Sequence, residues 1–128
     1  MNVTIDEVSS ATYSTQVYQR KYDAFFLLEF PILPDPGYAL ALNYPSDSFL
    51  NSTAYSNDQV DSLIKDGFST LEANARDQIY SQIQDIMVAQ DPPEVWIAQP
   101  GWQLVTKPDL QGVSWSTWEG YDMAQLRF

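Results

Sequence analysis

The pattern of apolar and polar residues predicts one buried strand in the first third of the chain. The run at residues 22–30, YDAFFLLEF, is almost continuously apolar, which is typical of a strand covered on both faces. Shorter alternating or apolar stretches at residues 3–5, 95–98 and 102–105 predict further strands. We therefore expect residues 22–30 to form the central strand of a sheet.

Two segments after Asn57 have the helical period instead. Asn57 is a suitable N-cap for the first, and Pro92-Pro93 stops the second, which spans residues 73–90. The two apolar faces consist of Val60, Leu63, Ile64, Phe68 and Leu71, and of Ile79, Ile83, Ile86 and Met87. Weaker signals predict short helices at residues 11–19 and 38–42. The whole pattern predicts a mixed α/β fold, a single domain over residues 1–128 with two helices packed on a central strand.

Composition narrows the classes of function. The chain has 128 residues and is 45% apolar, which favours a folded core over disorder. Its 17 acidic and 6 basic residues give a net charge of -11, which repels phosphate backbones, so we expect no nucleic-acid partner. Cysteine and histidine are both absent, which excludes thiol chemistry and a Ser-His-Asp triad. These observations predict a protein that is not an enzyme and uses no cofactor.

Three aspartates near the first long helix suggest a metal site, but their spacing argues against it. Asp58, Asp61 and Asp66 lack the ligand order of a calcium-binding loop. Asp58 and Asp61 are better explained as first-turn acids, which the helix dipole favours. We therefore predict no metal site.

A specific series of residues spans the middle of the chain. In order, it comprises Asn51, Tyr55, Asn57, Val60-Asp61, Leu63-Ile64, Arg76, Ile79-Tyr80, Ile83-Gln84, Asp91 and Pro93, with Tyr22-Asp23 and Asp35-Pro36 upstream. This series resembles the C-terminal portion of extracytoplasmic solute-binding proteins of ABC importers, of the peptide-binding type known as family 5. The resemblance covers nearly the whole chain, although such receptors are several times longer.

The resemblance implies a periplasmic-binding-protein-like lobe, present here as a partial domain. The implied function is capture of a small peptide, an oligosaccharide or another solute by hinge closure, followed by delivery to an ABC permease in the membrane. The implied location is extracytoplasmic, in the periplasm or at the cell surface, with the signal sequence outside this chain. We also expect the chain alone to bind solute poorly and to self-associate through uncovered apolar surface.

Six residues are candidates for ligand contact. The loop after the expected strand lines the cleft in the family, which points to Glu29, Phe30, Leu33 and Asp35. Asn51 and Tyr55 could offer amide and phenol groups to the ligand. Each has a structural alternative, because Asp35 suits a turn and Tyr55 suits packing against the following helix. Where the family has a Trp and a loop Asp, this chain has Glu29 and Ile32. In peptide-binding members of the family this loop carboxylate pairs with the amino terminus of the ligand, so we expect the solute to be either a peptide or another small molecule.

The alternative function is a stand-alone carbohydrate- or protein-binding module. Its candidate stacking residues are the tryptophans Trp96, Trp102, Trp115 and Trp118, although tryptophans in a small domain more often belong to a core or an interface.

Overall fold

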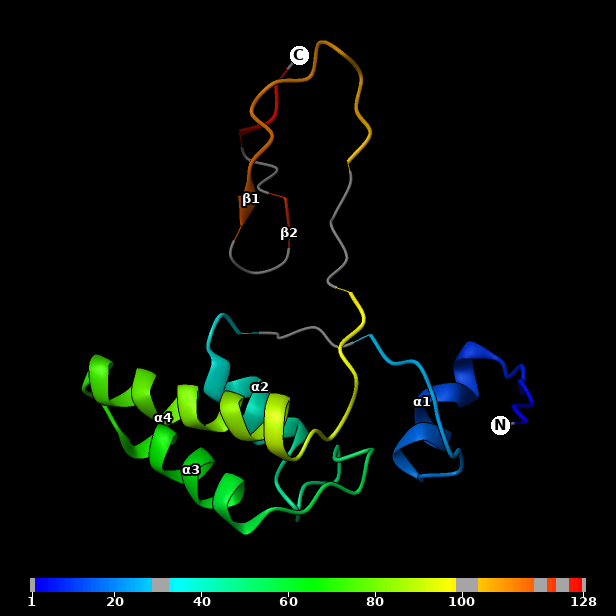
Figure 1. Cartoon of the computed structure of the whole chain (residues 1–128). Coiled ribbons are helices and arrows are strands. Elements are labelled where there is room, and N and C mark those ends of the chain that lie inside the picture. Colours follow the sequence, from blue (N-terminus) through cyan, green and yellow to red (C-terminus); the bar gives the residue numbers. More distant parts are fainter. Residues whose placement is uncertain (1, 29–32, 99–103, 117–119, 122–124, 128) are drawn as a thin grey trace.

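Helices dominate the part of the chain that the structure describes. The structure is a computed structural model, and it describes residues 2–28, 33–98, 104–116, 120–121 and 125–127. Its elements are α1 (Ser10–Tyr18), α2 (Pro36–Asn43), α3 (Asp58–Ser69), α4 (Ala73–Asp85), the π-helical turn η1 (Ile86–Gln90), β1 (Trp115–Ser116) and β2 (Gly120–Tyr121). In Figure 1, α2, α3 and α4 pack together, α1 lies to one side, and the small β1–β2 hairpin lies away from the helices.

Side-chain caps fix where the two long helices begin. The Asn57 side-chain oxygen accepts hydrogen bonds from the backbone N–H groups of Gln59 and Val60, at 3.1 and 3.2 Å. Glu72 does the same for α4, accepting from Asn74 and Ala75 at 3.0 and 2.7 Å. These bonds satisfy N–H groups that have no partner inside the helix. The predicted start after Asn57 is confirmed, and α4 starts after Glu72.

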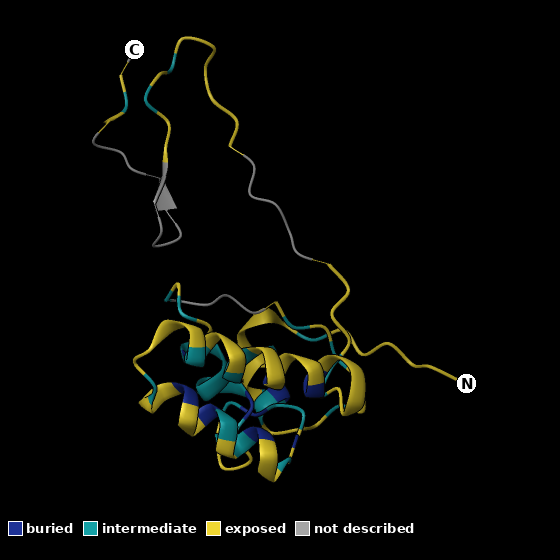
Figure 2. Ribbon diagram, turned by 60° about the vertical axis from the view of Figure 1, so that its left-hand side comes forward, coloured by how far each residue is buried: buried dark blue, intermediate teal, exposed yellow. Residues whose placement is uncertain are grey.

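The helix faces meet in one core. Val60 and Ile64 of α3 pack against Ile83 of α4 and against Ile86 and Met87 of η1, and all five are buried. Figure 2 shows the buried positions on the facing sides of the helices. Burying each larger side chain contributes roughly 1.5–3 kcal/mol. The predicted helix faces are confirmed at these five residues, but two other predicted members are exposed: Phe68 and Leu71.

The α1 helix docks on the loop that precedes α3. Val17 is fully buried, and the Arg20 guanidinium donates to the Asn51 carbonyl oxygen at 3.0 Å. Arg20 has a positive φ of 56°, a left-handed conformation that turns the chain after the helix. The short helices predicted at residues 11–19 and 38–42 are confirmed as α1 and α2.

The predicted α/β fold is wrong. Residues 22–28 form no strand, and Phe26 is 81% exposed. A strand is stable only where a neighbouring strand accepts and donates its backbone hydrogen bonds, and among the described residues this segment has no such neighbour. The long helices therefore pack on each other and on α2 rather than on a sheet. A periplasmic-binding-protein-like lobe built around a central strand is not what the chain forms.

The other predicted strands fail for the same reason. Residues 3–5 and 95–98 are exposed and form no strand, and Leu104 and Val105 are likewise exposed outside any strand. Trp102 lies outside the described residues. No helix within the described ranges is both long and apolar enough to cross a membrane.

Candidate functional site

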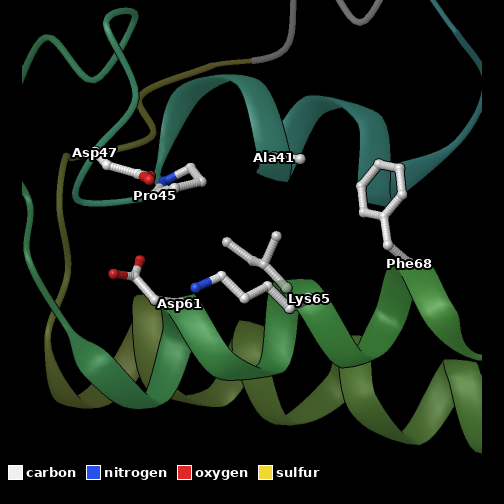
Figure 3. Close-up of a pocket in the computed structure, with 7 residues that line it drawn as sticks. Ala41, Pro45, Asp47, Asp61, Lys65 and Phe68 are labelled. Atoms are coloured by element: carbon white, nitrogen blue, oxygen red, sulfur yellow. The ribbon is translucent and has the colours of Figure 1, made fainter.

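An open, mostly apolar pocket of about 370 Å³ lies between α2 and α3 (Figure 3). Three of its residues come from α2 and the turn after it, and four come from one face of α3. The lining residues are Ala41, Pro45, Asp47, Asp61, Ile64, Lys65 and Phe68.

The spacing on α3 explains why its four residues share the pocket. Ile64 and Lys65 come three and four residues after Asp61, and Phe68 comes four and three residues after them, so all four lie on a single face of the helix. This face borders the core, because Ile64 is buried whereas Lys65 and Phe68 are exposed. The pocket is therefore the edge of the α2–α3 contact, where the core opens to solvent.

Ser46 ties the opposite wall to α3. Its backbone N–H donates to one carboxylate oxygen of Asp61 at 3.1 Å, and its hydroxyl donates to the other oxygen at 2.5 Å. Asp61 thus holds the turn after α2 in place. Asp47, on the same turn, is exposed and carries no hydrogen bond or ion pair within the described residues.

The charged side chains gather at one end of the pocket. Figure 3 shows the carboxylates of Asp47 and Asp61 at the end opposite Phe68, with the Lys65 ammonium reaching toward Asp61. Within the described residues, no ion pair joins Lys65 to either carboxylate. The pocket therefore combines an apolar floor with an acidic end.

Asp35, a predicted ligand contact, is occupied by structural bonds. It caps α2 by accepting from the Gly37 N–H at 2.8 Å, and its two oxygens accept from Arg76 Nη2 at 2.8 and 2.9 Å. The hydrogen bond from Arg76 is the main cause that lowers the pKa of Asp35, against burial, which raises it. The structural alternative, in which Asp35 bonds to the backbone of its own turn, agrees with the hydrogen bond from Gly37.

Asn51, a second predicted contact, is an internal brace. It is 1% exposed, its amide donates to the carbonyl oxygens of Pro45 and Tyr55 at 3.1 and 2.7 Å, and its side-chain oxygen accepts from the Tyr55 N–H at 3.0 Å. Because Pro45 lines the pocket, Asn51 supports the pocket wall from behind. Its polar atoms point into the protein and not toward a ligand.

Tyr55 belongs to the core, 8% exposed. Its hydroxyl has no hydrogen-bond partner within standard geometry among the described residues. Burial is the first cause that raises the pKa of Tyr55 to about 12, and the negative charge of Asp91 adds to it. Asp91 itself accepts a hydrogen bond from the Asn57 amide at 2.8 Å, which ties the start of α3 to the end of η1.

The remaining predicted contacts do not join these residues. Leu33 is half-buried beside the α2 cap, whereas Glu29 and Phe30 lie outside the described residues. The structure therefore does not assemble the six predicted residues into one site. The sequence analysis did not predict the pocket. The helical spacing of Asp61, Lys65 and Phe68 could have indicated that these three residues share a face. The position of Asp47 in a loop gave no indication that it lies near them.

A second cluster with tight geometry joins α2, α3 and α4. Arg76 donates from Nε to the Gly67 carbonyl oxygen at 3.0 Å, and its guanidinium carbon lies 5.0 Å from the centre of the Tyr80 ring. Tyr80 packs directly against the Cα positions of Gly37 and Gly67. Glycine is needed at both positions for this close approach, because a Cβ atom would lie within 2.7 Å of Tyr80.

No group of three or more carboxylates in the described ranges is arranged to hold a metal ion. Compared with known proteins, the chain matches no family model, no curated protein and no solved structure.

Proposed function

We propose that the chain serves in the substrate-binding component of an ABC importer, which captures a peptide or another small solute outside the cytoplasm and presents it to a membrane permease. The observation that carries this proposal is that polar residues of the family-like series pair with one another in space. Arg76 bonds to Asp35, 41 positions away, and Asn57 bonds to Asp91, 34 positions away.

These pairs support the proposal because, if the resemblance to the family were accidental, the residues that carry it would have no reason to bond to one another. The Arg76–Asp35 pair joins α4 to the start of α2, and the Asn57–Asp91 pair joins the start of α3 to the end of η1. The series thus describes one interlocked unit. A sequence motif that maintains a common structure would contain such bonded pairs.

The pocket gives this unit a place for a solute. Pockets for small ligands typically have volumes of about 300–1,000 Å³, and the α2–α3 pocket lies at the lower end of that range. Because it is open, a bound solute keeps part of its surface in water. Efficient capture therefore requires a second surface that closes over the pocket, as in the hinge closure of two-lobed receptors.

The proposal can be tested in the cell that makes the protein. A strain lacking the gene is grown on a defined mixture of peptides and oligosaccharides, and depletion of each compound from the medium is followed by mass spectrometry. We expect one solute class to remain undepleted, and the wild-type gene to restore its uptake. Fractionation should place the protein outside the cytoplasm.

Two variants control this experiment. Asp66→Ala changes an exposed residue of α3 and should restore uptake, whereas Ile83→Asp removes a core side chain and should not. Identical depletion profiles with and without the gene, together with a cytoplasmic location, would overturn the proposal. Carbohydrate or protein binding by such a cytoplasmic chain would favour a stand-alone binding module.

A further inference from the structure

We propose that the pocket between α2 and α3 binds an organic cation, a protonated amine carried on an apolar chain or ring. This assignment names the solute class for the capture function proposed above and rests on it. Three features of the pocket support it: an apolar lining, two carboxylates at one end of which Ser46 holds Asp61 in place, and a lysine side chain that lies where such a ligand would lie.

The floor favours an apolar ligand body. Ala41 and Pro45 line one side, the buried Ile64 adds to the lining, and Phe68 lies at the far end and is 54% exposed. Apolar surface that a ligand removes from water here contributes to binding in proportion to its area. A flat aliphatic or aromatic group therefore gains more from this surface than a sugar with hydroxyls on every face.

The acidic end favours a cation. Each oxygen of Asp61 accepts one hydrogen bond from Ser46, and a carboxylate has about four acceptor positions, so Asp61 retains capacity for a ligand donor. Asp47 carries no partner within the described residues. Asp61 is already held in place by Ser46, so an ammonium group would meet an oriented carboxylate.

Lys65 shows how an alkylammonium group fits. Its side chain runs along the pocket and its ammonium reaches toward Asp61 (Figure 3). Because Lys65 is exposed and makes no ion pair among the described residues, a ligand amine can displace it at small cost. The lining carries two carboxylates and one ammonium, and the chain carries a net charge of -11, so the field attracts cations and repels anions.

The test is a titration of the isotope-labelled chain, followed by NMR chemical shifts. The probe is n-hexylammonium, compared with 1-hexanol and hexanoate, which have the same apolar chain but no charge or the opposite charge. We expect hexylammonium to shift the resonances of Ile64 and Phe68, hexanol to bind about tenfold more weakly because it lacks the attraction of two carboxylates, and hexanoate to bind least.

Variants of the pocket locate the effect. Asp47→Asn should weaken hexylammonium binding about threefold and leave hexanol binding unchanged, as expected for one exposed charge pair. Lys65→Met removes the competing ammonium and should strengthen hexylammonium binding by a similar factor. Asp66→Asn makes the same chemical change as Asp47→Asn at an exposed position of α3 outside the pocket, and should have little effect.

Equal binding of hexylammonium and hexanol, or an unchanged affinity in Asp47→Asn, would overturn the cation assignment. The outcome is separable from that of the uptake experiment. If hexylammonium does not bind selectively but the cells still deplete one solute class only when the gene is present, the cation assignment is wrong and the receptor role stands. If hexylammonium binds selectively but depletion is the same with and without the gene, the receptor role is wrong and the cation site stands.

Discussion

The helical unit at residues 36–91 and the extended segments that flank it are both rich in apolar residues, yet only the first buries them. Ile83 and Val60 in the helical unit are 1% and 0% exposed, whereas Phe26 and Val95 in the flanks are 81% and 84% exposed. Apolar composition therefore does not decide burial in this chain. The difference lies in whether a segment can satisfy its own backbone and present one face to a neighbour.

A helix does both locally. Its N–H and C=O groups bond within the segment, and the 3.6-residue period places apolar residues on one side. An extended segment does neither alone, because its backbone groups point sideways and need a second strand. Residues 22–28 and 95–98 have no such strand among the described residues, so side chains such as Phe26 and Val95 remain in solvent.

The largest effect should come from placing the same charge in each region. Ile83→Asp should unfold the chain or lower its free energy of unfolding by at least about 3 kcal/mol, because an unpaired charge replaces a core side chain. Phe26→Asp in the flank should change it by less than about 0.5 kcal/mol. Urea unfolding followed by circular dichroism measures both, with Asp66→Ala as the surface control. Similar losses in the two aspartate variants would mean that the flank is part of the core.

Sequence reasoning succeeded for the fold where the information is local. The N-cap at Asn57, the two apolar faces and the stop before Pro92 are properties of neighbouring residues, and all appear in the structure. It failed at residues 22–28 because a buried strand is defined by partners elsewhere, which an apolar run does not specify. The prediction that Leu71 belongs to the apolar face was wrong, because this residue lies beyond the last turn of α3 and is 96% exposed.

For the candidate site, the sequence indicated the residues but not their roles. Asp35 and Asn51 are polar residues at special positions, as predicted, but their side chains bond to the protein itself. Whether a polar side chain faces inward depends on tertiary contacts such as Arg76 on Asp35, which spacing alone does not reveal. Asp47 in the pocket could not be predicted, because its role depends on where the turn after α2 meets α3.

The second prediction uses the buried phenol of the helical unit. The pKa of Tyr55 is about 12, against 10.0 for an exposed tyrosine, mainly because of burial. Since the folded state holds this proton more tightly, the stabilisation is complete below pH 10 and is lost as pH rises toward 12. The loss should reach about 2–3 kcal/mol, measured by urea unfolding at pH 9 and pH 12.

Tyr55→Phe should remove most of this pH dependence and cost little at neutral pH, because the hydroxyl makes no hydrogen bond of standard geometry within the described residues. Tyr22→Phe, in the flank, should leave most of the alkaline loss in place. If Tyr55→Phe unfolds between pH 10 and 12 as the wild type does, the phenol is not the titrating group.

Close packing in the helical unit gives a third test. A Cβ atom at Gly37 would lie 2.2 Å from the Tyr80 hydroxyl oxygen, so Gly37→Ala should destabilise the chain by about 2 kcal/mol. Tyr80→Phe removes that oxygen and should rescue Gly37→Ala. It should not rescue Gly67→Ala, where the clash is with ring carbon Cε1 at 2.7 Å. Equal rescue of both, measured by thermal unfolding, would contradict this geometry.

The exposed apolar segments on either side of the helical unit should cause the protein to self-associate. Exposed apolar extended segments pair with other chains, so we expect the protein to self-associate as its concentration rises. Phe26→Asp and Val95→Asp should each weaken association about tenfold, or ~1.4 kcal/mol, with no change in helix content. Sedimentation velocity with the Asp66→Ala control distinguishes these outcomes. A wild-type chain that stays monomeric throughout would show that the flanks are covered.

The smallest effect concerns the pair that links the family-like series to the fold. Asp35 and Arg76 are 39% and 29% exposed, so a double-mutant cycle with Asp35→Asn and Arg76→Met should give a coupling of only about 0.5–1 kcal/mol. Asparagine keeps the cap on α2, so the cycle isolates the charge.

The coupling should also depend on pH in one direction. Arg76 lowers the pKa of Asp35 below its ordinary 3.8, so the carboxylate form is favoured by folding. Its contribution is present above pH 3.8 and is lost as pH falls through the folded pKa. Urea midpoints of the four proteins at pH 7 and in acid measure both limits. A coupling near zero at pH 7 would mean that the pair does not hold α2 on α4, and the proposed receptor role would lose one of the two pairings that support it.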